Sequence, residues 1–176
     1  MKHVMIDLET WDNVPTAAVV QIGACYFDPF TGNIGKTFEA FVDASSEIDN
    51  GFTVGADTIY WWLNQKDIAQ VEAHGPKHRR RSSITAWMGL NFFLDEAEHV
   101  WSHATFDFVI VMNHIKNLNI GPNTHYRDAR DLRTLCHLAQ INPYSYPHAG
   151  TAHVALDDCK RQVQYASDAY QKLYQV

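Results

Sequence analysis

The chain has 176 residues, of which 46% are hydrophobic, and its formal net charge is −6. This length and hydrophobic content suit one folded domain over residues 1–176 and exclude a chain that is disordered throughout. The negative charge argues against a broadly basic nucleic-acid binder, but not against an enzyme that meets phosphates through bound cations.

The cysteines and the first residues indicate where the protein resides. The chain has three cysteines, Cys25, Cys136 and Cys159, which is an odd number and forms no paired metal-binding motif. We therefore expect free thiols in a reducing compartment. Asp7 and Glu9 interrupt any apolar segment near the start, which argues against a signal peptide, and no run is long enough to cross a bilayer. These features predict a soluble, cytoplasmic protein.

The first predicted strand, residues 4–10, carries two carboxylates two positions apart. Side chains alternate along a strand, so Asp7 and Glu9 project to the same side, roughly 6–7 Å apart. Such a pair repels and is costly to bury unless a cation lies between the two groups. Oxygen ligands favour Mg²⁺ or Mn²⁺ over zinc. Taken alone, the pair fits a strand end in solvent more often than a metal site.

Residues 17–27 and 36–42 form the next two predicted strands, because they are rich in β-branched and aromatic residues. The Pro, Gly and Asn of residues 28–33 predict a turn between them. We therefore expect an antiparallel meander that begins with the carboxylate strand.

A helical pattern follows over residues 58–65, with a second short helix over 66–73. Trp61 and Trp62 are neighbours in the first of these helices, and neighbouring side chains on a helix point about 100° apart. One interpretation is that both rings cover the core from two sides. The other is a stacking platform for nucleic-acid bases.

The only basic cluster, residues 77–81, favours a solvated loop over a phosphate-binding surface. Ser82 or Ser83 can cap the helix that runs to Leu94. A short strand over residues 99–102 then leads into an apolar, buried helix over 105–112.

Asp107 lies in the first turn of that buried helix. An acid there often complements the helix dipole. Here Phe106 and Phe108 flank the carboxyl group, and an unpaired charge is costly in such surroundings. A metal-bound carboxylate explains the position better.

The remaining elements are a strand end and helix over residues 125–135, a loop over 142–150 and a final amphipathic helix. The loop delivers His153, and Asp158 lies at the start of the final helix. Singly, these two residues would be an ordinary surface histidine and a dipole-complementing acid.

As a set, Asp7, Glu9, Asp107, His153 and Asp158 resemble the pattern of the DEDDh family of 3′–5′ exonucleases, over nearly the whole chain and in the same order. Residues 59–65 and 126–135 look most like a subgroup that contains a phage exonuclease and a mycobacterial exoribonuclease. One branch of that subgroup acts on DNA and the other on RNA, so the sugar of the substrate stays open.

The resemblance implies roles for individual residues. Asp7, Glu9 and Asp158 would hold one Mg²⁺ or Mn²⁺ ion, and Asp7 would bridge to a second ion that Asp107 supports. His153 would take a proton from the attacking water. A further group would contact the terminal nucleotide: Leu8, Thr10, Phe106, Trp61 and Trp62.

The resemblance also implies an α/β domain of the ribonuclease H-like fold, with a mixed five-stranded sheet flanked by helices. Its expected activity is the release of nucleoside 5′-monophosphates from the 3′ end of single-stranded nucleic acid. A catalytically silent nucleic-acid-binding module is an alternative, disfavoured by the complete set of acids and histidine. A polymerase-associated proofreading subunit ranks lower. Related enzymes are often dimers, so the resemblance also implies a homodimer. The periodicity of the sequence gives no evidence for or against one.

Overall fold

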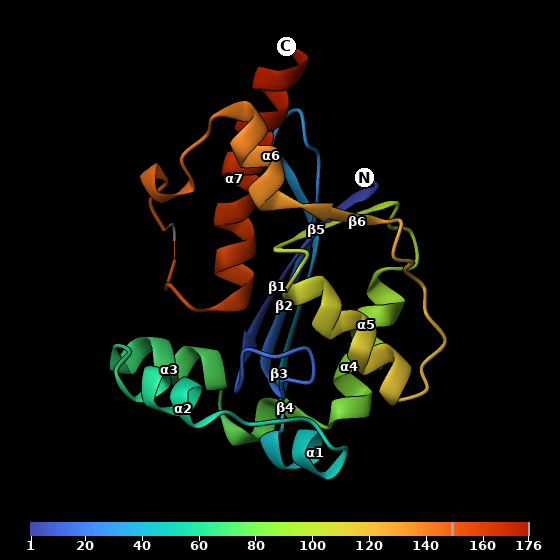
Figure 1. Cartoon of the computed structure of the whole chain (residues 1–176), viewed down its shortest axis with the longest axis vertical. Coiled ribbons are helices and arrows are strands. Elements are labelled where there is room, and N and C mark those ends of the chain that lie inside the picture. Colours follow the sequence, from blue (N-terminus) through green and yellow to red (C-terminus); the bar gives the residue numbers. More distant parts are fainter. Residues whose placement is uncertain (149, 176) are drawn as a thin grey trace.

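The computed structural model describes residues 1–148 and 150–175, which form a six-stranded sheet with helices on both faces (Figure 1). The strands lie in the order β4-β3-β2-β1-β5-β6. Their bounds are β1 His3–Thr10, β2 Val19–Phe27, β3 Ile34–Val42, β4 Arg80–Arg81, β5 His99–Ser102 and β6 Ala129–Asp131. β1, β2 and β3 are the predicted antiparallel meander, whereas β5 and β6 continue the sheet parallel to β1.

The helices form a layer on each side of the sheet. Their bounds are α1 Ala44–Asp49, α2 Ala56–Leu63, α3 Asp67–His74, α4 Ser83–Phe93, α5 Asp107–Asn117, α6 Leu132–Ala139 and α7 Ala155–Tyr174. In Figure 1, α6 and α7 cover one face, α4 and α5 cover the other, and α2 and α3 lie together beside the lower end of the sheet.

Alternation along β1 separates two hydrophobic cores. Val4, Ile6 and Leu8 pack with residues of α4 and α5. Met5 points to the opposite face and packs with residues of α6 and α7. Asp7 and Glu9 follow Met5 at the same two-residue spacing, so they share the face that α7 covers.

The α/β class with a mixed sheet is confirmed, and the sheet has one strand more than the five predicted. The additional strand is β4, which pairs in parallel with the end of β3. It comprises only Arg80 and Arg81, from the basic cluster interpreted as a solvated loop. Two exposed charged residues carry no alternating pattern, so sequence periodicity has nothing to detect there.

Helix α1 was also not predicted, and a long-range contact explains its formation. The Glu47 carboxylate on α1 is fully buried and accepts hydrogen bonds from the Val19 backbone N–H at 2.9 Å and the Trp87 indole N–H at 3.2 Å. It also contacts His114 Nε2 at 2.8 Å. These partners come from β2, α4 and α5, so α1 is held by tertiary structure rather than by its own six residues.

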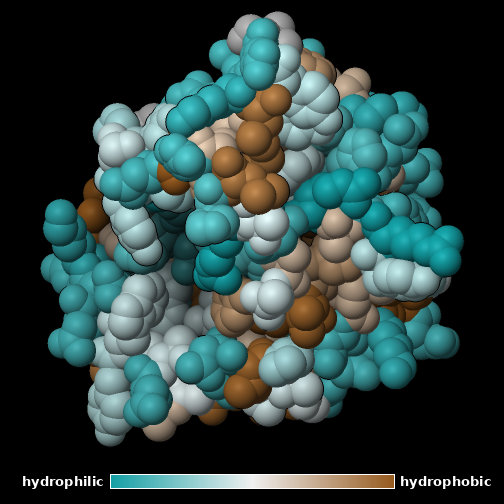
Figure 2. All heavy atoms as spheres, turned by 45° about the horizontal axis from the view of Figure 1, so that its top comes forward, coloured by the Kyte–Doolittle hydropathy of each residue, from teal (hydrophilic) through white to brown (hydrophobic). Residues whose placement is uncertain are grey.

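Hydrophilic side chains cover most of the face shown in Figure 2, with hydrophobic side chains gathered in small groups between them. Scattered apolar side chains of this kind are ordinary on folded proteins. In the described part of the chain, no helix combines the length and apolar character that a bilayer crossing requires.

Candidate active site

Four carboxyl side chains from three elements lie beside the end of β1. Asp7 and Glu9 come from β1 itself, Asp107 is the first residue of α5, and Asp158 lies in the first turn of α7. The structure therefore brings together the four acids that the sequence singled out, although they are up to 151 positions apart along the chain (158 − 7).

Asp107 is anchored by two backbone groups. Its Oδ1 accepts a hydrogen bond from the Leu8 N–H at 3.2 Å, and its Oδ2 accepts one from the His103 N–H at 3.0 Å. Only 2% of Asp107 is exposed. These bonds join the start of α5 to β1, and they orient the carboxyl group toward the other acids.

A close helix–strand approach places Asp158. A Cβ atom on Gly23 of β2 would lie 2.3 Å from the backbone carbonyl carbon of Ala155, so only glycine fits there. The Gln21 side-chain oxygen accepts a hydrogen bond from the Ala155 N–H at 2.9 Å, and the Cys159 thiol donates to the Gly23 carbonyl at 3.3 Å. The first turn of α7 is thus pressed against the sheet, and Asp158 reaches the acids of β1.

His153 lies just before α7 in a left-handed backbone conformation, with φ = 64°. This conformation costs a residue other than glycine on the order of 1 kcal/mol. The His153 N–H donates to Asp158 Oδ2 at 2.8 Å, which holds the turn in place. Donor atoms of Glu9, His153 and Asp158 all lie within 4.8 Å of one another.

Burial and mutual repulsion shift the protonation of the acids. Burial is the largest cause that raises the pKa of Asp7 and of Glu9 well above their usual values, and neighbouring carboxylates add to it. Burial raises the pKa of Asp107 to about 7, and it also raises that of Asp158. The protein alone therefore holds this cluster under electrostatic stress, which bound cations would relieve.

Burial has the opposite effect on the histidine. It lowers the pKa of His153, although the nearby Asp158 carboxylate acts to raise it. The imidazole is therefore neutral near pH 7 and has a ring nitrogen able to accept a proton.

The donor chemistry of the cluster fits hard divalent cations. Carboxylate oxygens predominate, as Mg²⁺ and Mn²⁺ prefer. Gln162 of α7 donates from Nε2 to Asp7 Oδ1 at 2.6 Å, while its Oε1 is buried with no partner among the described residues. A buried carbonyl oxygen without a donor is costly, and a cation or its water would satisfy it.

A hollow of about 350 Å³ adjoins the acids. Five residues predicted for the site line it, namely Leu8, Glu9, Thr10, Trp61 and Phe106. Two aromatic side chains beside a carboxylate provide apolar surface and polar groups in one place, as nucleotide sites require.

Trp62 differs from its predicted stacking role. Only 2% of it is exposed, and its indole N–H donates to the Thr10 carbonyl at 2.9 Å. Its ring is therefore part of the support beneath β1, and no base can stack on it. Helical spacing shows that Trp61 and Trp62 face different ways, but it does not show which of them faces inward.

Sequence reasoning missed two residues of the site. His148 Nδ1 lies 3.3 Å from Asp158 Oδ1, on the side of that carboxylate opposite the His153 N–H bond to Oδ2. Gln162 is the other, and it falls four residues after Asp158 on α7. That i, i+4 spacing places both on one helix face, a signal that could have revealed Gln162. Nothing in the loop sequence distinguishes His148 from its neighbours.

Comparison with known proteins was made for sequence and for structure. The family described as the 3′-5′ exoribonuclease Rv2179c-like domain matches residues 2–170. No curated protein sequence matches the chain.

The structural similarities are to exonuclease I. One structure of exonuclease I, described as suggesting how processivity is achieved, has a TM-score of 0.66 at 14% identity and covers 98% of this chain and 43% of its own. E. coli exonuclease I in complex with a dT13 oligonucleotide has a TM-score of 0.67 at 12% sequence identity, and the match covers 98% of this chain and 42% of that chain. The zinc-bound form of the E. coli enzyme with single-stranded DNA has a TM-score of 0.62 at 15% sequence identity, and the match covers 98% of this chain and 40% of that chain. The chain thus spans about two-fifths of these proteins and shares the ribonuclease H-like fold with that part.

Proposed function

Because the chain belongs to the family of 3′-5′ exoribonuclease Rv2179c-like domains, a 3′–5′ exonuclease of the DEDDh type, we propose that it removes nucleoside 5′-monophosphates from single-stranded 3′ ends. We further propose that it needs two divalent cations, Mg²⁺ or Mn²⁺, and that residues 1–176 act as one domain.

One observation carries this proposal: four buried or half-buried carboxyl groups converge, and no lysine or arginine of the described residues forms an ion pair with any of them. Among the described residues, the ion pairs of the cluster involve only His103 with Asp107 and His148 with Asp158. Structural ion pairs would need a fixed cationic side chain at this place. An uncompensated acidic cluster instead suits metal-dependent phosphodiester hydrolysis.

The four acids would hold the ions in the arrangement that the family pattern implies. Asp7, Glu9 and Asp158 are assigned to one ion, and Asp7 and Asp107 to the other. When bound, such a pair of cations activates the attacking water and stabilises charge on the leaving 3′ oxygen. Gln162 fixes the orientation of the Asp7 carboxyl group through its 2.6 Å hydrogen bond.

His153 would serve as the general base. Its imidazole stands beside Glu9 and Asp158 and is neutral near pH 7, so a ring nitrogen accepts the proton that the attacking water releases. Asp158 would position His153 through the backbone of the same turn, because Asp158 Oδ2 accepts the hydrogen bond from the His153 N–H.

The hollow beside the acids would receive the 3′-terminal nucleoside. Trp61 and Phe106 line it and offer ring faces for the base, which stack without preference for sequence. The Leu8 backbone N–H is already bonded to Asp107, and the Thr10 hydroxyl donates to the Asp12 carbonyl at 2.6 Å. Leu8 and Thr10 therefore shape the wall of the hollow and keep the β1 end rigid.

We propose RNA as the preferred substrate, in accordance with the name of the family. Single-stranded DNA is the second candidate, because structurally similar exonuclease I was crystallised with DNA oligonucleotides. A catalytically silent binding module remains the alternative from another class. It would have no use for His153 in a strained conformation beside Asp158.

A gel time course tests the proposal. RNA and DNA strands of equal sequence, labelled at the 5′ end, are incubated with Mg²⁺, Mn²⁺ or EDTA. We expect a ladder that shortens from the 3′ end only when metal is present, with RNA degraded faster. The Asp158→Ala variant is the control and should leave both strands intact.

Two results would contradict the proposal. Cleavage that persists in EDTA, or in Asp158→Ala, would remove the acidic cluster from the mechanism. Binding of both strands without any shortening would favour the silent module.

A further inference from the structure

Arg133 is a cation without a partner beside the acidic cluster. It is exposed in the first turn of α6, and its side chain forms no ion pair and no hydrogen bond with the described residues. Other arginines are bound within the protein: Arg130 donates to His99 Nδ1 at 2.9 Å, and Arg79 pairs with Glu39 at 2.9 Å. The charge of Arg133 is therefore available to a group from outside.

The carboxyl groups next to Arg133 already have other partners. Asp131 caps α6, because its Oδ2 accepts a hydrogen bond from the Thr134 N–H at 3.0 Å. Its Oδ1 accepts one from the Ala104 N–H at 3.2 Å. Asp107 is likewise held by two backbone N–H groups. Both carboxyl groups are thus bonded to backbone donors, and neither forms an ion pair with Arg133.

Parallel strands bring Arg133 to the edge of the sheet where the acids lie. β1, β5 and β6 run parallel, and Ser102 at the end of β5 pairs with Asp131 at the end of β6. Ligands of open α/β sheets bind beyond the carboxyl ends of such strands. Since β6 lies two strand spacings, about 10 Å, from β1, Arg133 lies to one side of Asp7. Burial raises the pKa of Asp107 to about 7 and the Arg133 charge acts to lower it, so the guanidinium lies near that carboxyl group.

The direction of the reaction indicates where the substrate strand continues. In an in-line displacement, the attacking water and the leaving oxygen lie on opposite sides of the phosphorus atom. The proposed base, His153, lies beside Glu9 and Asp158, so we expect the water on that side. The leaving 3′ oxygen and the nucleotide that carries it then lie on the side of Asp107. Arg133 is the free cation on this side of the cluster.

We propose that Arg133 binds a phosphate of the substrate strand, namely the second phosphodiester from the 3′ end. The first phosphodiester is the one that is cleaved at the acids, and the second follows it on the 5′ side of the leaving nucleotide. A guanidinium group donates two parallel hydrogen bonds to phosphate oxygens. The inference rests on the proposed 3′–5′ exonuclease function and adds a phosphate subsite to it.

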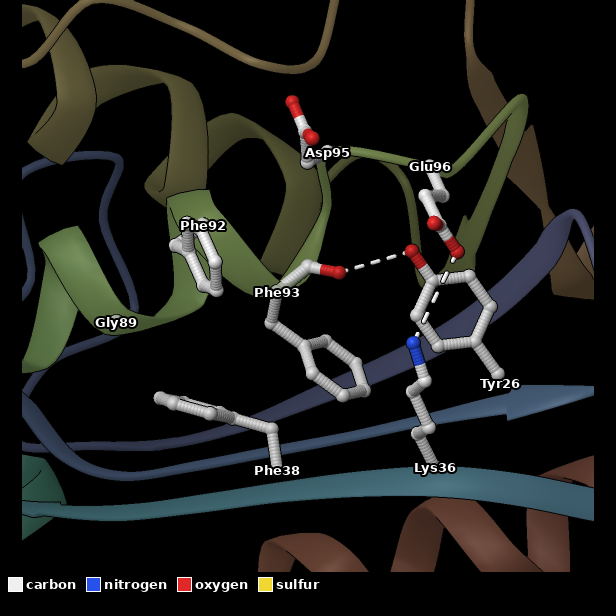
Figure 3. A pocket seen from close by; sticks show the side chains of 8 residues that line it. All are labelled: Tyr26, Lys36, Phe38, Gly89, Phe92, Phe93, Asp95 and Glu96. Carbon is white, nitrogen blue, oxygen red and sulfur yellow. Dashed lines mark hydrogen bonds and ion pairs between the residues drawn. The ribbon is translucent and has the colours of Figure 1, made fainter.

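Another cavity with a cation in its wall does not suit a phosphate. It is a hollow of about 400 Å³, and Figure 3 shows Lys36 there together with Asp95 and Glu96. Lys36 Nζ pairs with Glu96 at 3.9 Å, and the two acids outnumber the single cation. Lys36 also lies near the start of β3, which is level with the start of β1 across β2 and therefore far from the acids. It is the matched control for Arg133.

Uncharged linkages in the substrate provide the test. A 5′-fluorescein-labelled RNA strand carries one methylphosphonate at the second or the third linkage from the 3′ end, with a 2′-O-methyl group on the adjoining ribose. The reference strand carries the same methyl group and an ordinary phosphate. Fluorescence anisotropy measures binding to the full chain with Ca²⁺ in place of Mg²⁺, and a gel checks that the strands stay intact.

The expected result is coupling between Arg133 and one phosphate. The second-linkage methylphosphonate should raise the dissociation constant of the wild type about tenfold, but should not weaken binding by Arg133→Gln further. Arg133→Gln should weaken binding of the reference strand by a similar factor and reduce the slope of log K against log salt by about 0.7. Lys36→Gln should change neither quantity. Far-UV circular dichroism checks that each variant is folded.

Three outcomes would overturn the inference: a second-linkage effect that is equal in the wild type and Arg133→Gln, coupling of Arg133 to the third linkage instead, and a wild type that binds no strand. The gel time course with Mg²⁺ separates the inference from the proposed function. Binding that depends on Arg133 without cleavage would refute the function alone. Cleavage without coupling between Arg133 and the second linkage would refute the inference alone.

Discussion

The indole ring of Trp61 meets the imidazole ring of His153 edge to face, with ring centroids 4.8 Å apart and planes at 84°. Edge-to-face aromatic pairs contribute about 0.5–1.5 kcal/mol beyond simple burial. Trp61 also lines the hollow proposed for the terminal nucleoside. One side chain thus contacts the proposed base and lines the proposed nucleotide pocket, so we expect substrate binding to be coupled to the orientation of His153.

Replacing Trp61 should reveal this coupling. We expect Trp61→Ala to lower kcat about tenfold, because the imidazole loses its orienting neighbour, and to raise KM as the stacking surface is removed. Trp61→Phe keeps an aromatic ring and should retain most of kcat. Steady-state kinetics on a short single strand measure both constants. A change in KM alone would mean that Trp61 only stacks.

Asp7→Asn should separate activity from stability. Burial and, after it, repulsion from the neighbouring carboxylates raise the pKa of Asp7; removing the charge relieves both, so we expect a gain of about 1 kcal/mol and a rise in Tm of about 3 °C. Turnover should fall roughly a thousandfold or more. Differential scanning calorimetry and the gel assay measure the two effects. Asp49→Asn, at an exposed position on α1, should change neither quantity.

Divalent cations should stabilise the folded chain through the acidic cluster. An ion that binds only the folded state raises stability by about 2.7 kcal/mol at a hundredfold excess over its dissociation constant. We expect Mg²⁺ or Mn²⁺ to raise the Tm of the wild type, EDTA to reverse the shift, and Asp7→Asn to show much less of it. An equal shift in both proteins would locate the ion elsewhere.

Gly23→Ala should displace α7. The new Cβ would overlap the backbone of Ala155, so the helix must move or the sheet must bend, at a cost of about 3 kcal/mol. Because the same contact places Asp158, activity should fall as well. Urea unfolding and the exonuclease assay test both effects. Gly51→Ala offers a comparison at a glycine with an open environment, although its φ of 84° adds local strain.

His3 should make stability depend on pH in a mildly acidic range. Burial, together with His99 and Arg130, lowers the pKa of His3 from 6.5 to about 4. The unfolded chain therefore binds a proton between these values that the folded chain does not, and stability falls as the pH decreases from 6.5 toward 4. His3 is half-exposed, so we expect a loss of only about 1 kcal/mol.

The control for this effect is His3→Gln. Its amide oxygen can still accept the hydrogen bond that the Trp101 indole donates to His3 Nδ1 at 3.0 Å, but it does not titrate. Denaturant unfolding at pH 7 and pH 5 compares the two proteins. Equal pH dependence in both would assign the effect to other groups.

The local elements could be predicted because their patterns are complete within a few residues. Alternation in β1, turn residues after β2 and the four-three spacing of α7 are each readable without tertiary contacts. The acids became a site only as an ordered set that resembles a known family. Taken singly, Glu9 and His153 do not depart from what an ordinary strand end or surface loop would carry, and only Asp107, between two phenylalanines, indicated a metal by itself.

Features that depend on contacts across the chain were not predictable. The formation of α1 needs the fully buried Glu47 and its partners on β2, α4 and α5. The inward position of Trp62 depends on the Thr10 carbonyl, and the approach of His148 to Asp158 depends on how the loop folds back over α7. Sequence patterns indicate which face of a helix or strand a residue occupies, but they do not indicate which distant group that residue will contact.

The alternation in β1 has a consequence for how the chain folds. A slip of β1 by one residue against β2 would turn Asp7 and Glu9 into the apolar layer of α4 and α5, and would turn Leu8 toward α7. Burying two carboxylates in that layer would cost far more than misplacing aliphatic side chains. The acidic pair therefore excludes the most accessible misaligned sheet, and a strand with apolar residues at both positions would lose this protection.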